Sequence, residues 1–332
     1  MPPLPMQHGR IRGSLYGLAC VDALGGPVEF STRGTFPLVT KMLYNPNFSL
    51  PPGSWTDDTS MTLCLAMSLA ERRSFDLKDQ VQRYINWLKH GYLSSQKGCA
   101  FDVGLATRVA LDIWDNELQE PGGSISRGQE SIDASLNKEV RCGNGSLMRT
   151  APIALLHWQD SNDQVDGLTA KAGSVTHPHP QCIEACQVYV RMIREIMRAD
   201  EEQPGKDALF AVLKCFPFET PKLQAIFSAY QTLDDMRQTP DTEIRSSGFV
   251  VHTLQAALWA FFSTENFMDG AIKVVNLGDD ADTVGAVYGG LAGAYYGFGE
   301  LPKEWVEALQ ARDVIDKVVE AVVELVSNQG AS

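Results

Sequence analysis

The 332-residue sequence has few of the features that mark secreted, membrane or nucleic-acid-binding proteins. Its seven cysteines are odd in number and scattered, so they do not form a disulfide framework. With 28 Lys and Arg against 41 Asp and Glu, the net charge is -13, and no basic block offsets it to bind a nucleic-acid backbone. The first residues lack a basic region leading into an apolar stretch, as a signal peptide would have. We therefore expect a reduced, cytoplasmic monomer with no direct nucleic-acid or membrane partner.

Long uninterrupted hydrophobic runs are also absent. The uncharged segment from Thr283 to Phe298 is short and rich in glycine, which favours a buried helix over a membrane span. Four glycines recur in it at four-residue intervals, namely Gly285, Gly289, Gly293 and Gly297. Each costs a helix about 1 kcal/mol relative to alanine. This spacing predicts a central helix that a neighbouring backbone approaches closely.

Strand-type alternation is scarce, and apolar residues recur at three- and four-residue intervals through most of the chain. The sequence therefore predicts an all-α protein, with one domain over residues 1–332 and an ordered core over about 8–327. Polar connectors are expected around residues 122–139, 199–207 and 234–247. Helices are expected at 11–24, 59–72, 77–90, 103–114, 151–157, 183–198, 208–215, 248–262, 267–277, 283–296 and 305–326.

Two acidic clusters stand near the two ends of the chain. Each begins an expected helix, where one Asp or Thr is enough to cap the free N–H groups. The clusters exceed that need, and their hard oxygen donors suit Mg2+ or Mn2+. We therefore predict metal ligands at Thr56, Asp57, Asp58, Asp280, Asp282 and Thr283. Two metals sharing such ligands could clamp the reacting oxygens of a substrate.

Three other segments carry candidate chemistry. Glu29 follows a Gly/Pro-rich turn that could bring it to the acids, although it could equally be a solvated loop residue. The segment Arg141-Cys-Gly-Asn-Gly-Ser146 offers backbone N–H groups suited to phosphate, but alone it indicates a tight turn and matches no nucleotide motif. The segment His177 to Cys186 holds two His and two Cys with the wrong spacing for common zinc ligand pairs. Cys182 and Cys186 are therefore predicted as buried thiols, and His177 as a ligand-facing group.

Five motifs in order resemble the ADP-ribosylglycohydrolases over almost the whole chain. They are Gly17-Leu-Ala-Cys-Val-Asp22-Ala-Leu-Gly25-Gly-Pro-Val-Glu29, Trp55-Thr-Asp-Asp-Thr59, Gly143-Asn-Gly-Ser-Leu-Met-Arg149, Thr176-His177 and Leu277-Gly-Asp-Asp-Ala-Asp-Thr283. The resemblance implies an all-α fold with two Mg2+ or Mn2+ ions on the six ligands named above. It also implies that Glu29 is an acid on a mobile loop. The implied ADP-ribose contacts are Gly104, Arg141, Cys142, Gly143, Asn144, Gly145 and His177.

Two residues depart from the family pattern. Val21 stands where the family commonly has glycine, and Cys142 where some relatives place an aromatic residue near the ligand. The second departure weakens any transfer of substrate preference, but no metal ligand is missing.

The function implied is hydrolysis of the glycosidic bond between ADP-ribose and an acceptor. Glu29, Asp58 and Asp282 are the candidate catalytic acids, with Glu29 or an Asp freed from metal as the base. The alternatives are a non-catalytic ADP-ribose-binding relative and a two-metal phosphohydrolase that cuts a nucleotide diphosphate. The sequence does not choose among arginine, serine, polymer and O-acetyl conjugates of ADP-ribose.

Overall fold

The computed structural model describes residues 4–199 and 203–330, and over these residues it contains helices and no β-strand. The predicted all-α class is confirmed. The helices are α1 (Leu4–Gly25), α2 (Asp57–Arg72), α3 (Leu77–His90), α4 (Leu105–Gln119), α5 (Ile125–Leu136), α6 (Ala151–Leu156), α7 (Asn162–Ser174), α8 (Pro180–Arg198), α9 (Lys206–Cys215), α10 (Pro221–Ala229), α11 (Leu233–Gln238), α12 (Val250–Phe262), α13 (Phe267–Val275), α14 (Ala281–Tyr296), α15 (Lys303–Ala308) and α16 (Arg312–Gly330). Short 3-10 turns include η1 (Gly26–Val28), η3 (Leu147–Arg149) and η5 (Phe298–Glu300).

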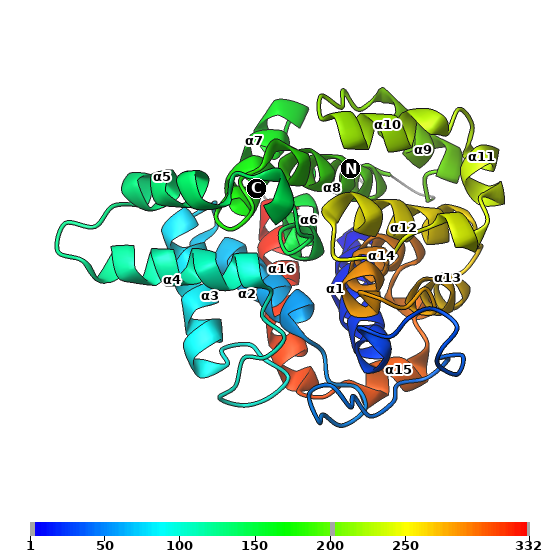
Figure 1. Ribbon diagram of the computed structural model, residues 1–332, viewed down its shortest axis with the longest axis horizontal. Helices are drawn as coiled ribbons and strands as arrows, with labels where there is room; N and C mark the ends of the chain where they lie inside the picture. Colours follow the sequence, from blue (N-terminus) through cyan, green and yellow to red (C-terminus); the bar gives the residue numbers. More distant parts are fainter. Residues whose placement is uncertain (1–3, 200–202, 331–332) are drawn as a thin grey trace.

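Helices α1 and α14, from opposite ends of the chain, pack side by side at the centre of the molecule (Figure 1). Their backbones touch because both contact faces carry glycine. A Cβ added to Gly289 would lie 2.2 Å from the carbonyl oxygen of Gly17, and one on Gly293 would lie 2.0 Å from that of Gly13. The predicted close approach is therefore confirmed for Gly285, Gly289 and Gly293. Gly297 differs, since it ends α14 with a φ of 83°.

Replacing Gly289 with alanine is expected to lower the free energy of unfolding by about 1–3 kcal/mol, because the methyl group cannot fit against the Gly17 carbonyl. Gly167→Ala is the matched control, since a Cβ at this exposed helical position of α7 meets no atom within 4 Å. The control should be neutral or stabilising by up to about 1 kcal/mol. Denaturant melts of both variants measure the difference. Equal stabilities would mean that α1 and α14 are not in backbone contact.

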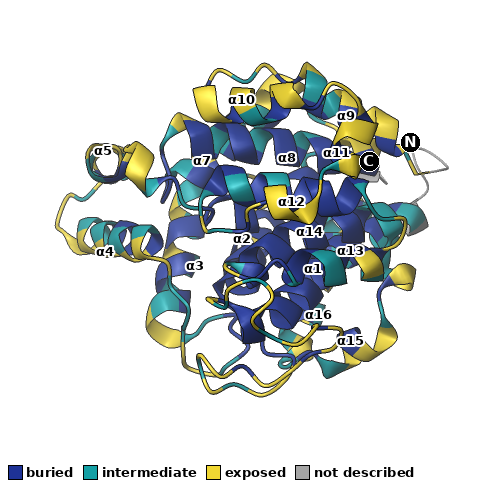
Figure 2. Ribbon diagram, turned by 45° about the vertical axis from the view of Figure 1, so that its right-hand side comes forward, coloured by how far each residue is buried: buried dark blue, intermediate teal, exposed yellow. Residues whose placement is uncertain are grey.

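The helices around this pair place the site. Figure 2 shows α1, α2 and α14 as almost wholly buried, whereas α4, α5 and α10 expose one face. Helix α2 contacts α1, α3, α6 and α16, and helix α14 contacts α1, α8, α12 and α13. The starts of α2 and α14 are therefore held inside the protein, together with the polar residues that begin them. Among the described helices, none combines the length and hydropathy needed to cross a membrane.

Several expected boundaries were wrong. The segment 305–326 is two helices, α15 and α16, because Ala311 adopts a φ of 44° and Gln310 N–H bonds the carbonyl of Gly53 at 2.9 Å. The first polar connector, around 122–139, contains α5, and the third, around 234–247, contains most of α11. Helices α7 and α10 were also missed. The second connector, around 199–207, lies partly outside the described residues.

Candidate active site

The start of α2 is not capped by the side chain of its own N-cap residue. Thr56 is the residue before α2, yet its side chain makes no capping hydrogen bond. Its hydroxyl lies 3.0 Å from Asp22 Oδ1 and 2.8 Å from Asp58 Oδ2. Asp22 also accepts the backbone N–H of Thr56 and both the N–H and hydroxyl of Thr59. The start of α2 is thus held against α1 by a buried carboxylate.

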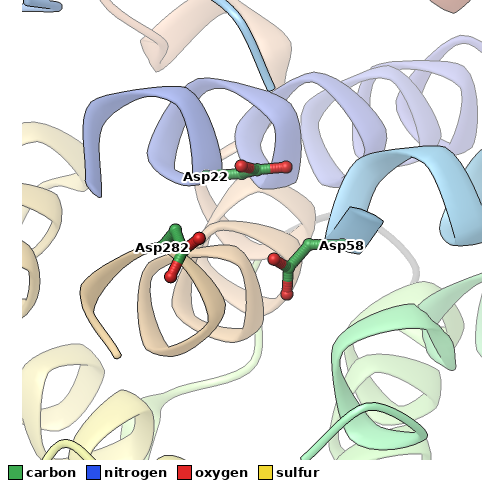
Figure 3. Close-up of side chains that lie close together, drawn as sticks. All are labelled: Asp22, Asp58 and Asp282. Carbon is green, nitrogen blue, oxygen red and sulfur yellow. The ribbon is translucent and has the colours of Figure 1, made fainter. Parts of the chain in front are cut away.

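The acids at the start of α14 lie close to Asp58 of α2 and Asp22 of α1. Asp280 precedes the helix and makes no side-chain cap, and the hydroxyl of Thr283 lies 3.4 Å from Asp58 Oδ2. Figure 3 shows Asp22, Asp58 and Asp282 directed toward one another from α1, α2 and α14. One oxygen from each of these three carboxylates lies within 4.8 Å of the other two, so they could hold a metal ion.

A second group of three carboxylates contains Glu29, Asp102 and Asp282, again with one oxygen of each within 4.8 Å of the others. Glu29 is 4% exposed, which excludes the alternative of a solvated loop residue. Two buried oxygens of the cluster, Glu29 Oε2 and Asp58 Oδ1, have no hydrogen-bond partner. A bound cation would satisfy the oxygen of Asp58, since buried carboxylates are stable when they are paired or coordinate a metal.

The acids cannot all be ionised without a compensating charge. Burial, together with neighbouring carboxylates, raises the pKa of Asp57, Asp58 and Asp282 well above the ordinary value. Burial and the charge of Asp102 raise the pKa of Glu29 to about 10. Burial also raises the pKa of Asp22 to about 7, although four hydrogen bonds favour its charged form. A divalent cation would reverse these shifts by favouring the carboxylate forms.

The cluster lies beside a cavity of about 810 Å³. Glu29, Asp57, Asp280 and Thr283 line it, whereas Asp58 and Asp282 are buried and are not part of its lining. Of the predicted ADP-ribose contacts, the cavity is lined by Gly104, Gly143, Asn144, Gly145 and His177. Segments far apart in the sequence thus form one pocket that joins an acidic cluster to a glycine-rich turn.

Arg141 and Cys142 do not line this cavity. Cys142 lines a neighbouring cavity of about 750 Å³, which shares Gly143 and Gly248 with the first. Arg141 lines neither of the two. Both residues precede the turn and are absent from the lining of the cavity beside the acids. The predicted ADP-ribose contacts of Arg141 and Cys142 stay predictions.

Asn144 holds the two sides of the pocket together. Its amide nitrogen donates to Asp280 Oδ2 at 2.6 Å and to Thr253 Oγ1 at 2.9 Å. Its backbone N–H bonds the carbonyl of Gly248 at 3.1 Å. Since both amide protons are used inside the protein, the side chain of Asn144 orients a predicted metal ligand, and a ligand would meet the backbone of the turn.

The zinc alternative at His177, His179, Cys182 and Cys186 has no support in the structure. All seven cysteines are free, and Cys182 and Cys186 are buried as predicted. The Cys186 thiol bonds Ser146 Oγ at 3.5 Å, and that of Cys182 bonds the carbonyl of Gly143 at 3.6 Å. Within the described residues, the metal-compatible groups contain only carboxylates.

The loop that carries Glu29 is fastened to the start of α14. Phe30 N–H bonds the carbonyl of Asp279 at 2.7 Å, and Asp279 N–H bonds that of Ser31 at 2.8 Å. Phe30, Gly278 and Asp279 all have positive φ values. A Cβ on Gly278 would lie 2.5 Å from the Ser31 carbonyl oxygen, so this junction requires glycine. In this conformation a carboxylate oxygen of Glu29 lies within 4.8 Å of oxygens of Asp102 and Asp282.

Sequence reasoning missed two acids of the cluster, Asp22 and Asp102. Asp22 lies between Val21 and Ala23 on an otherwise apolar stretch of α1, and a buried acid at such a position was an available signal. Asp102 has a φ of 54°, unusual for a residue other than glycine, but no pattern in the sequence marks it.

The variant Asp282→Asn is expected to lose divalent-metal binding while keeping or gaining stability without metal. In the metal-free fold the raised pKa of Asp282 means that the folded state favours its protonated form. At neutral pH the unfolded chain releases that proton, so the charge opposes folding and a neutral amide removes the conflict. Thermal melts with and without Mn2+ measure both effects. Asp163→Asn, at an exposed position of α7, is the control. A lower metal-free melting temperature with unchanged metal binding would make Asp282 a structural residue.

The fold and the pocket define an all-α protein with a buried acidic cluster suited to a divalent cation. A family model described as ADP-ribosylglycohydrolase matches residues 4–332. The chain therefore belongs to the ADP-ribosylglycohydrolase family, as the sequence motifs predicted.

Relatives and a solved structure agree with this membership. The chain is 35% identical over 319 residues to the ADP-ribosylarginine hydrolase Tri1 of Pseudomonas putida, covering 94% of this chain and 77% of that protein. It is 32% identical to the ADP-ribosyl-[dinitrogen reductase] glycohydrolase of Rhodospirillum rubrum, covering 93% and 92% of the two chains. A solved ADP-ribosylglycohydrolase-related protein complex superposes with a TM-score of 0.78 at 36% identity, covering 97% of this chain and 99% of that one.

Proposed function

We propose that this protein is a divalent-metal-dependent ADP-ribosyl hydrolase, which cleaves the glycosidic bond between ADP-ribose and an acceptor and releases ADP-ribose. One observation carries the proposal. The two acidic clusters meet beside a cavity whose wall includes the Gly143–Gly145 turn, so a site for a metal-chelated sugar adjoins a site for an anionic group. Family membership supports the same chemistry.

The residues proposed to hold two Mg2+ or Mn2+ ions are those predicted from the sequence, Thr56, Asp57, Asp58, Asp280, Asp282 and Thr283. Their oxygens are of the type these ions prefer, and the unpartnered oxygen of Asp58 fits such an ion. When bound, the ions would chelate ribose hydroxyls and increase the acidity of a water molecule. Asp22 and Asn144 would orient the ligands, Asp22 through Thr56 and Asn144 through Asp280.

The bond that breaks joins ribose C1 to the acceptor. Water adds its oxygen to C1 as this bond breaks, and the bonding electrons leave with the acceptor, which takes up a proton. Glu29 lines the cavity and is the proposed base that accepts the water proton. Asp102 shares a hydrogen bond with Glu29, so it would hold that carboxyl group in position.

We propose an arginine side chain as the acceptor. The cavity wall beside Glu29 includes Asp102 and Asp279, which are not among the predicted metal ligands and would attract a guanidinium group. Two relatives at 35% and 32% identity are named ADP-ribosylarginine hydrolases, which supports this choice.

Product analysis tests the proposal. The protein is incubated with Mg2+ or Mn2+ and with arginine, serine, polymer and O-acetyl conjugates of ADP-ribose, and the products are separated. Free ADP-ribose, formed fastest from the arginine conjugate, is the expected result. AMP with ribose phosphate would instead identify a phosphohydrolase. Binding of ADP-ribose without any product would identify a non-catalytic reader.

A further inference from the structure

Arg149 is a buried cation directly beneath the glycine turn. It ends η3, is 1% exposed, and its guanidinium lies over the ring of Tyr84 at 5.0 Å. It donates to the carbonyl of Gly145 at 2.6 Å and to Thr176 Oγ1 at 2.7 Å. Within the described part of the chain, no ion pair with a carboxylate involves Arg149. The turn therefore lies over a positive charge that its surroundings do not neutralise.

The hydrogen bonds of Arg149 determine which ring nitrogen of His177 carries the proton. A guanidinium can only donate, so Thr176 Oγ1 must accept from it. The single hydroxyl proton of Thr176 then has one acceptor within the described residues, His177 Nδ1, which lies 2.8 Å away. Nδ1 is thus the acceptor, and a neutral ring must carry its proton on Nε2.

The ring stays neutral for an electrostatic reason. Burial lowers the pKa of His177 to about 3, and the charge of Arg149 acts in the same direction. The imidazole of His177 therefore carries one proton throughout the neutral pH range. Which of its two nitrogens carries that proton is set by Thr176.

The protonated nitrogen lies at the glycine turn. A Cβ on Gly143 would lie 3.4 Å from Nε2, and one on Gly145 would lie 2.8 Å from Cε1 of the same ring. His177 lines the cavity, and no protein hydrogen bond to its Nε2 is found within residues 4–199 and 203–330. The Nε2–H group is therefore left to a ligand in the cavity.

We propose that Arg149, acting through Thr176, is a positioning residue that fixes His177 as a neutral Nε2–H donor for an anionic oxygen of the substrate. This rests on the proposed function for the identity of that oxygen, which belongs to the diphosphate of ADP-ribose. The donor, the glycine turn and the buried guanidinium then form one anion-binding region next to the acids, to which Asn144 of the turn is bonded through Asp280.

The tautomer is tested by 15N NMR of histidine-labelled protein, with the signals of His177 assigned from a His177→Gln variant. Wild-type His177 should carry its proton on Nε2 and should not titrate between about pH 5 and 8. Thr176→Val removes the donor to Nδ1 and should allow protonation at either nitrogen, whereas Thr176→Ser should restore the wild-type signals. A proton on Nδ1 in the wild-type protein would overturn the proposal.

Binding supplies a second readout. Thr176→Val should weaken ADP-ribose binding about two- to fivefold, because only a fraction of His177 then carries its proton on Nε2, and should leave adenosine binding unchanged. Thr169→Val is the matched control, because the Thr169 hydroxyl is also buried but bonds the carbonyl of Val165. Equal weakening of ADP-ribose and adenosine would contradict a role specific to the diphosphate. These outcomes do not depend on hydrolysis, so failure of the proposed function would be seen separately in the product analysis.

Discussion

Removal of divalent metal is expected to abolish hydrolysis of ADP-ribosyl conjugates, and added Mg2+ or Mn2+ should restore it. The carboxylates of Asp57, Asp58 and Asp282 are buried and close to other acids, and their pKa values are raised well above the ordinary range. Without a cation these acids favour protonation, and no ion is present to chelate ribose hydroxyls or to order a water molecule. Release of ADP-ribose is measured before chelation, after chelation and after metal is added back.

Two controls make this result interpretable. Circular dichroism of the chelated protein should show that the helices remain, so that the loss of activity is not unfolding. Elemental analysis should show a molar amount of bound metal below that of the protein after chelation. If a folded, metal-depleted preparation hydrolysed ADP-ribosyl conjugates at the original rate, the assignment of a catalytic metal site would be wrong.

Substitution of Glu29 by glutamine is expected to lower kcat by about 100-fold or more while ADP-ribose still binds in the presence of metal. The carboxyl group lies at the cavity, is almost fully buried, and has an oxygen without a partner. Glutamine keeps the size of the side chain but cannot accept a proton from water. Steady-state kinetics measure kcat, and calorimetric titration with ADP-ribose measures binding.

The matched control is Glu300→Gln, at an exposed position of η5, which should leave kcat and binding unchanged. An unaltered kcat in Glu29→Gln would remove this residue from the reaction and leave Asp58 or Asp282 as the base. Weaker ADP-ribose binding with an intact kcat would make Glu29 a substrate-holding residue.

Long helices with a clear apolar period could be predicted from the sequence, because their pattern is local. The helices over 59–72, 77–90 and 283–296 begin and end within two residues of α2, α3 and α14. Helices α5 and α11 were missed because short, polar segments carry a weak period and are stabilised by caps. Ser124 accepts the N–H of Arg127 at the start of α5, and Thr232 accepts that of Asp235 in α11.

Most acids of the candidate site could also be predicted from the sequence, since two clusters exceed what helix capping requires. That they meet beside one cavity depends on the contact of α1 with α14, which the glycines at 285, 289 and 293 permit. The sequence by itself therefore determined the fold class and the family, and it predicted the residue types of the candidate site. Only the tertiary structure added Asp22 and Asp102 to the cluster, turned the Asn144 amide toward Asp280, and placed Arg149 behind Thr176 and His177. The physical reason is that residue type sets what a side chain can bind, whereas its direction and burial are set by helices that are distant in sequence and adjacent in space.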